Sequence, residues 1–229
     1  MTDVFAITGT NGKTTASYML RNILCYSGRK TGLIGTITHQ IGEEEYSPVN
    51  TTPGKALLRT YFDKMDSKHM DCCVIEASSH GLVQGRLDDT EISYGAFTNL
   101  TQDHLDYHKT MEEYFRCKCL LFERNLKGGA VNADDSWGQK ILKSYGKKDK
   151  LASVSMKDKH SDYFGRTAAS DITGQELEIY IKGEYAGAVR LSMPGVQFAY
   201  DALIAIGLAY EYGIDFDRIT TVMVCRPVR

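Results

Sequence analysis

The feature that most constrains this chain is a glycine-rich segment, 8–15, which reads Thr-Gly-Thr-Asn-Gly-Lys-Thr-Thr. The apolar run Val4–Thr8 leads into it and predicts a buried strand, and the apolar spacing from Lys13 to Tyr26 predicts a helix. A strand, a glycine-rich loop and a helix in this order can bind phosphate, because the loop and the helix N-terminus point free N–H groups at the anion. Lys13 would add a positive charge, and the Thr14 hydroxyl could bind Mg²⁺.

The loop is not a complete Walker A sequence. The pattern G-x-x-x-x-G-K-[ST] requires a glycine at the position of Ile7. We therefore favour a shorter variant of the phosphate loop. Two alternatives stay open: a glycine-rich turn whose lysine binds no ligand, and a P-loop kinase or NTPase, which would also explain Lys13 and Thr14.

Strand patterns alternate with helical patterns along most of the chain. Strands are expected at 4–8, 31–36, 72–76, 94–98, 129–131 and 151–154, and helices at 13–26, 55–65, 111–125, 137–145 and 198–212. This alternation predicts an α/β fold with a mainly parallel sheet flanked by helices. Beyond Asp162, the runs 176–181 and 185–191 predict a small antiparallel hairpin layer that turns at Gly183. One domain spanning residues 1–229 is expected.

Charge and cysteine content narrow the classes of partner. The chain has 27 Lys and Arg residues against 29 Asp and Glu residues, so it lacks the basic excess of a typical nucleic-acid-binding protein. Its six cysteines form no C-x-x-C pair, which indicates reduced thiols in a cytoplasmic protein and neither a zinc site nor a disulfide framework. No apolar stretch is long enough to cross a bilayer. We expect a cytoplasmic monomer without a nucleic-acid or membrane partner.

Two segments that follow predicted strands carry candidate metal ligands. Glu76 ends the strand 72–76, at the sheet edge where open α/β folds bind ligands, so it could bind Mg²⁺ together with Thr14. A salt bridge at the strand end is the alternative for Glu76. The segment Asp103–His108 holds two histidines and two aspartates, and His104 could either ligate a cation or hydrogen-bond within a turn.

A lysine lies on the apolar face of the helix predicted at 111–125. The spacing of Met111, Tyr114, Phe115 and Phe122 places Lys118 on their side of the helix. An inward lysine is ion-paired, extends to solvent, or loses its proton because desolvation lowers the pKa of an amine. A neutral amine can add CO₂ to form a carbamate that is able to hold Mg²⁺.

Taken together, four ordered segments of this chain resemble the Mur ligase family. They are Gly9–Thr15 (G-T-N-G-K-T-T), Asn50–Pro53 (N-T-T-P), Glu76–Leu82 (E-A-S-S-H-G-L) and 97–108, followed by Lys118. The resemblance covers nearly the whole chain as the central ATP-binding domain of that family. It is strongest to the members that add the third residue of the peptidoglycan stem peptide to UDP-N-acetylmuramoyl-dipeptide. It therefore implies an ATP-dependent ligase that activates a carboxylate as an acyl phosphate for attack by an amino acid.

The resemblance also implies roles for individual residues. Lys13 would contact the β and γ phosphates of ATP, Thr14 and Glu76 would hold one Mg²⁺, and His104 with carbamylated Lys118 would serve a second Mg²⁺ and the acyl phosphate. The other nucleotide-binding positions would be Gly9, Thr10, Asn11, Gly12, Thr15, Asn99, Asn132 and Asp134. The positions that would grip the muramoyl-peptide are Asn50, Thr51, Thr52, Ser78, Gln84 and Arg86.

One segment departs from the family pattern. Relatives read Gly-x-Phe-Asn-x-x-Asn before the last helix of the central domain, whereas this chain has Phe198 and Asp201 in place of the two asparagines. Those asparagines lie near the adenine in relatives, so altered base recognition is expected, and a nucleotide-binding module that acts only with a partner is a further alternative. The family's uridine-binding and amino-acid-binding domains are expected to be missing from these 229 residues, which leaves the identity of the added amino acid open.

Overall fold

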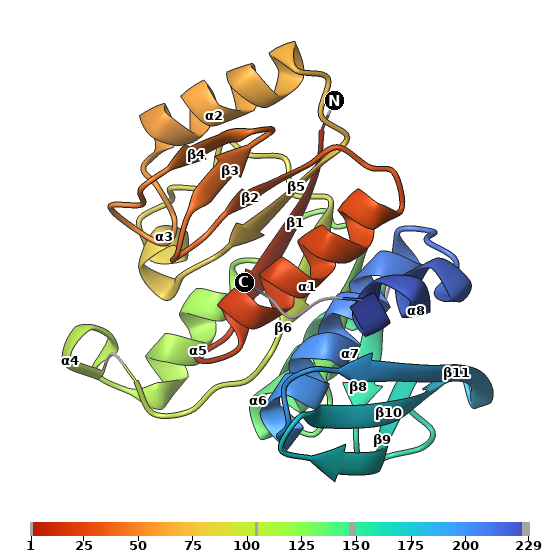
Figure 1. The fold of residues 1–229 in the computed structure, drawn as a ribbon. Coiled ribbons are helices and arrows are strands. Elements are labelled where there is room, and N and C mark those ends of the chain that lie inside the picture. Colours follow the sequence, from red (N-terminus) through yellow and green to blue (C-terminus); the bar gives the residue numbers. More distant parts are fainter. Residues whose placement is uncertain (1, 104, 147–149, 226–229) are drawn as a thin grey trace.

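The computed structural model describes residues 2–103, 105–146 and 150–225. Figure 1 shows the fold. The strands are β1 (Asp3–Thr8), β2 (Thr31–Ile34), β3 (His39–Ile41), β4 (Glu44–Tyr46), β5 (Cys72–Glu76), β6 (Tyr94–Phe97), β7 (Gly128–Asn132), β8 (Leu151–Ser155), β9 (Tyr163–Asp171), β10 (Gly174–Ile181) and β11 (Glu184–Leu191). The helices are α1 (Lys13–Tyr26), α2 (Lys55–Ser67), α3 (Ser79–Val83), α4 (Leu105–His108), α5 (Met111–Cys119), α6 (Ser136–Tyr145), α7 (Val196–Glu211) and α8 (Phe216–Cys225).

All of these strands belong to one sheet, in the order β11-β10-β9-β8-β7-β6-β1-β5-β2-β3-β4. The strands from β9 through β8, β7, β6, β1 and β5 to β2 pair in parallel, and antiparallel strands extend both edges. The predicted α/β class is therefore confirmed. The predicted hairpin is also present as β10 and β11, but β9 joins it and continues the same sheet.

The sheet separates two apolar cores. In β1, Phe5 and Ile7 pack into a core with α1 and α7, while Val4 and Ala6 pack into a second core with residues of α2, α5 and α6. Neighbouring residues face opposite sides because side chains alternate along a strand. Both faces of the central strands are thus covered by helices, which is why these strands are continuously apolar.

Some elements differ from the predictions. The helix predicted at 111–125 ends at Cys119, and the following turns are held by i to i+3 bonds such as Leu121 N to the Lys118 carbonyl at 3.2 Å. Strand β9 was not predicted, because six of its nine residues are exposed and polar or small, so its sequence lacks an apolar alternation. Strands β3 and β4 are too short, at three residues each, to give a pattern.

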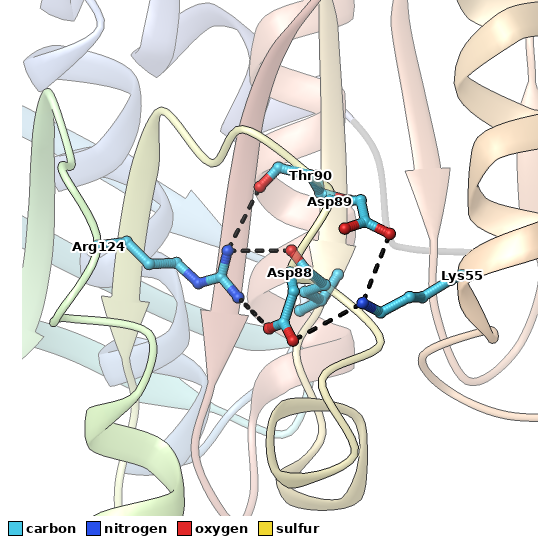
Figure 2. A network of polar contacts seen from close by, with 6 residues as sticks. Lys55, Asp88, Asp89, Thr90 and Arg124 are labelled. Carbon is cyan, nitrogen blue, oxygen red and sulfur yellow. Dashed lines mark hydrogen bonds and ion pairs between the residues drawn. The ribbon is translucent and has the colours of Figure 1, made fainter.

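A polar network holds the segment that connects α3 to β6 (Figure 2). Arg124 donates to the Leu87 carbonyl at 3.0 Å and to Asp88 Oδ1 at 3.2 Å, and Lys55 at the start of α2 lies 3.4 Å from an Asp89 carboxylate oxygen. The network ties this connection to α2 and to the turn after α5.

Within the described ranges, each helix is too short or too polar to span a bilayer.

Candidate active site at the carboxyl edge of the sheet

The glycine-rich loop joins β1 to α1 and is braced by the segment after β6. Asn99 Oδ1 accepts a 3.0 Å hydrogen bond from Asn11 N, and Asn99 Nδ2 donates to the Asn11 carbonyl at 3.1 Å. Gly9 must lack a side chain, since an added Cβ would lie 1.9 Å from Thr98 Oγ1. Among the described side chains none caps the N-terminus of α1. The first N–H groups of this helix are therefore available to bind an anion.

Lys13 is bonded to its own loop. Its Nζ donates to the carbonyl oxygens of Gly9 at 3.0 Å and of Thr10 at 2.8 Å. Burial lowers its pKa, while the charges of Glu76 and Asp103 act in the opposite direction. The amine is therefore held beside the loop, where it can reach a bound phosphate.

Thr14 and Glu76 meet at the end of β5. The Thr14 hydroxyl donates to Glu76 Oε2 at 2.9 Å. Thr36, after β2, donates from its backbone N–H to Oε1 and from its hydroxyl to Oε2, both at 2.9 Å. The Glu76 side chain is fully buried. The alternative of a strand-end salt bridge is excluded for the described residues, since the groups bonded to this carboxylate are hydroxyls and a backbone N–H.

Lys118 points inward from α5, as predicted, and is 1% exposed. Its Nζ donates to the Gly9 carbonyl at 2.9 Å and lies 4.5 Å from the centroid of the Tyr114 ring. Burial lowers the pKa of Lys118 well below its usual value, and the nearby charge of Lys13 lowers it further. The chain thus provides an amine that is readily deprotonated next to the phosphate loop.

These groups surround one cavity of about 240 Å³. Its lining comes from the loop, from the ends of β2 and β5, and from α5. The lining residues are Gly9, Thr10, Asn11, Gly12, Lys13, Thr14, Thr15, Thr36, Thr51, Glu76, Ser78, Ser79, His80, Tyr114 and Lys118. Larger hollows exist, such as one of about 750 Å³ between α2 and residues 86–91, but of the predicted site residues that one includes only Arg86.

Two of the predicted substrate-binding residues, Thr51 and Ser78, line this cavity. Thr52 donates to the Glu76 carbonyl at 2.7 Å and accepts from Ser78 N at 2.9 Å, and its own carbonyl accepts from Arg86 Nη1 at 2.6 Å. Arg86 is also bonded to Gln84 Oε1 at 2.6 Å. These contacts join two of the four motifs, Asn50–Pro53 and Glu76–Leu82, to Gln84 and Arg86 in one wall. The other four, Asn50, Thr52, Gln84 and Arg86, are outside the lining of the cavity, and Asn50 is exposed.

Three of the predicted nucleotide-binding residues are outside the lining. Asn99 braces the loop from behind. Asn132 donates to the Thr98 carbonyl at 2.8 Å, and the Asp134 carboxylate accepts from Ser155 at 2.6 Å and from Tyr200 at 2.7 Å. Asn132 and Asp134 are therefore engaged within the fold. The candidate ligand His104 lies outside the described residues.

The cavity also contains residues that the sequence analysis did not select. Thr36 binds Glu76, and Tyr114 OH lies 3.3 Å from Thr10 Oγ1 in the loop. Thr36 was identifiable in principle, because it ends the strand predicted at 31–36, at the same sheet edge as Glu76. Tyr114 was assigned to the apolar face of α5, which its ring does occupy while its hydroxyl reaches the loop.

Comparison with known proteins shows the family of this chain. The family model described as "Mur ligase middle domain" matches residues 7–209, which contain the loop, Glu76 and Lys118. The chain belongs to the Mur ligase family. Two relatives are named as UDP-N-acetylmuramoyl-L-alanyl-D-glutamate–2,6-diaminopimelate ligases. The relative from Clostridium acetobutylicum is 37% identical to this chain over 224 residues, and the relative from Clostridium botulinum is 39% identical over 217 residues. Each alignment covers 94% of this chain and 44% of the relative.

Solved structures of Mur ligases share the fold. A structure of a UDP-N-acetylmuramoyl-L-alanyl-D-glutamate–2,6-diaminopimelate ligase superimposes with a TM-score of 0.91 at 26% identity, over 100% of this chain and 47% of that one. A pseudomurein peptide ligase type C from Methanothermus fervidus, at 20% identity and a TM-score of 0.75, shows the same fold over 100% of this chain and 50% of its own. The chain thus spans about half the length of the Mur ligases it matches.

Proposed function

We propose that this chain is the ATP-binding core of an ATP-dependent amide ligase of the MurE type, in peptidoglycan precursor synthesis. The carboxylate of a UDP-N-acetylmuramoyl-dipeptide would be activated as an acyl phosphate and attacked by the amino group of an amino acid. The observation that carries the proposal is the convergence of Lys13, the Thr14–Glu76 pair and buried Lys118 on one cavity. Phosphoryl transfer depends mainly on positioning and on neutralising charge, which these groups can supply.

The donor set beside the loop suits Mg²⁺. The Thr14 hydroxyl and the Glu76 carboxylate are oxygen ligands, the type that Mg²⁺ prefers, and their oxygens lie 2.9 Å apart. A bound Mg²⁺ would neutralise charge on the phosphate oxygens of ATP. Thr36 would keep Glu76 oriented through its two hydrogen bonds, and Lys13 would bind the β and γ phosphates.

Lys118 would serve the same site as a carbamate. Its neutral amine can add CO₂ and release one proton, which yields an anion near the Gly9 carbonyl that Lys118 now contacts. With His104, the carbamate would hold a second Mg²⁺ and the acyl phosphate. The low pKa of Lys118 supports this assignment, because only the unprotonated amine reacts with CO₂.

The muramoyl-peptide would be bound by the wall next to the cavity, which consists of Asn50, Thr51, Thr52, Ser78, Gln84 and Arg86. Nucleotide binding would involve the loop residues 9–15 directly, with Asn99, Asn132 and Asp134 supporting it from behind. Residues 1–229 would form the central ATP-binding domain of the ligase. The relatives named above act on 2,6-diaminopimelate according to their names, so this is the first amino acid to test.

Phosphate release tests the proposal. The full-length protein that contains residues 1–229 is incubated with Mg–ATP, UDP-N-acetylmuramoyl-dipeptide and either 2,6-diaminopimelate, lysine or another amino acid, and inorganic phosphate and the tripeptide product are measured. Release that requires the dipeptide supports carboxylate activation, and product formation identifies the amino acid. Release that needs neither substrate would indicate an NTPase. Nucleotide binding without any turnover would favour a module that requires a partner.

A further inference from the structure

The carboxyl group of Asp201 lies directly behind the phosphate loop. Asp201 is on the first turns of α7 and is 5% exposed. A Cβ atom added to Gly12 would lie 2.1 Å from Asp201 Oδ1, and the Thr15 hydroxyl donates a hydrogen bond to this side chain. The carboxyl group thus packs against loop backbone that the glycine leaves uncovered, and Asp201 is not among the residues that line the cavity.

A negative charge at this position opposes binding of an anion in the loop. Burial raises the pKa of Asp201 to about 7, and the Thr15 hydrogen bond only partly offsets this effect. The elements packed against α7 are α1, α8 and the strands from β6 to β9, of which β6, β7 and β8 carry no charged residue. Charged or titratable residues on or next to these elements include Lys13 and Arg21 on α1, Asp134 after β7, Tyr163 on β9, Arg218 on α8 and Tyr200 on α7 itself.

None of these six groups contributes to the shift at Asp201. Asp134 is engaged with Ser155, Met156 and Tyr200, and Lys13 is bonded to loop carbonyls. Burial is therefore the main cause of the raised pKa of Asp201.

We propose that Asp201 takes up a proton from solvent when nucleotide phosphate binds in the loop, so that this residue sets how the affinity for the nucleotide depends on pH. The inference rests on the proposed function, because it treats the loop as the phosphate site. The neutral carboxyl group stays packed against Gly12, whereas the ionised group would face the phosphate charge across a single layer of backbone. An asparagine, as the family pattern has here, would be neutral at every pH.

Isothermal titration calorimetry with Mg–ATP tests the inference at pH 6 and pH 8. If Asp201, with a pKa of about 7, must be neutral in the complex, the Kd for Mg–ATP should rise by about tenfold from pH 6 to pH 8. At pH 8, titrations in two buffers with different ionisation enthalpies should show an additional uptake of close to one proton per nucleotide. The matched variant Asp201→Asn keeps the shape but cannot ionise, so it should show neither effect and should bind more tightly than the wild type at pH 8.

The comparison of the wild type with Asp201→Asn separates the inference on Asp201 from the proposed function. The γ-phosphate, Lys13 and Lys118 are common to both proteins, so only the difference between them reports Asp201. Equal pH dependence and equal proton uptake in the wild type and Asp201→Asn overturn the inference and leave the proposed function intact. Absence of binding by both proteins at both pH values overturns the proposed function and the inference with it. If Asp201→Asn does not fold, the same comparison is made with Asp201→Ser, and equal proton uptake in that variant and the wild type also overturns the inference.

Discussion

Lys13 and Lys118 donate hydrogen bonds to the same atom, the carbonyl oxygen of Gly9, over 3.0 and 2.9 Å. The two residues lie on different helices, α1 and α5, and beside the loop Lys118 is buried whereas Lys13 is half-buried. Two positive charges bonded to one oxygen atom repel each other, so the site favours the neutral form of one amine. The more deeply buried Lys118 is the residue whose pKa is lowered strongly. This shared contact underlies the first two predictions.

Replacing Lys118 with alanine should abolish ligation. The substitution removes the amine that would form the carbamate, and loss of one group that stabilises developing charge lowers kcat by about 10²–10³-fold or more. Added bicarbonate should not restore activity to Lys118→Ala. Tripeptide formation is the measurement, and Lys159→Ala, which alters an exposed lysine, is the control. Wild-type activity in Lys118→Ala would refute the carbamate.

Replacing Lys13 with alanine should eliminate ATP-dependent turnover, because the transferring phosphate loses its fixed cation. A decrease of at least about 10²-fold in kcat is expected from the loss of such a contact. Phosphate release under saturating Mg–ATP measures it. Turnover unchanged from that of the wild type would contradict the assignment of the loop.

Replacing Glu76 with glutamine should raise the Mg²⁺ concentration needed for half-maximal activity. The amide keeps the shape of the side chain but loses the charge that attracts the cation, so an increase of about 10–100-fold is expected. A Mg²⁺ titration at fixed ATP provides the measurement. Glu43→Gln, in the exposed turn between β3 and β4, is the matched control. Identical titration curves for Glu76→Gln and the wild type would place the cation elsewhere.

Replacing Asp201 with asparagine should stabilise the protein at high pH. The pKa of Asp201 is raised from 3.8 to about 7 in the folded state. Between these values the folded state binds more protons than the unfolded state, so stability falls as pH rises and becomes constant above about pH 7. The advantage of Asp201→Asn should therefore grow by about 2–3 kcal/mol between pH 5 and pH 8. Urea unfolding at both values measures it, and a constant difference would show that Asp201 does not titrate in this range.

Replacing Gly12 with alanine should destabilise the fold more than replacing Gly28. Both glycines have a positive φ, +85° and +87°, which is unfavourable for alanine. At Gly28 no atom lies within 4 Å of an added Cβ, whereas at Gly12 that Cβ meets Asp201. We expect a loss of about 1 kcal/mol for Gly28→Ala and about 2–4 kcal/mol for Gly12→Ala, from denaturant unfolding. Equal losses in the free energy of unfolding for the two variants would mean that Asp201 can move away from the added Cβ without destabilising the fold.

Much of the fold could be predicted from the sequence. The bounds of α1 and β5 agree with the predictions, because the helical spacing of α1 ends at Tyr26, shortly before Gly28, and β5 is a nearly continuous apolar run. Short or exposed strands such as β9 could not be predicted, since they have no apolar pattern of their own and are stabilised by pairing with β10.

The candidate site was predictable in part. Lys13, Thr14 and Glu76 follow from the positions of the loop and of the strand ends, and the inward side of Lys118 follows from helical spacing. The sequence analysis placed Asp201 near the base, whereas its carboxyl group packs against Gly12 of the phosphate loop. No sequence pattern indicated this contact, because 188 positions of the chain separate Asp201 from Gly12 and intervening strands decide how α7 meets α1.

By itself, the sequence determined the phosphate loop, the alternation of strands and helices and the resemblance to the Mur ligases. These features are local, because each depends on residues within one turn, one strand or one motif. Only the tertiary structure decided that Lys118 reaches the Gly9 carbonyl, that Thr36 binds Glu76 and that Asp201 lies behind the loop. The reason is the strand order: β1 lies between β5 and β6, and this order brings the segments that follow these strands to one edge of the sheet, around the loop.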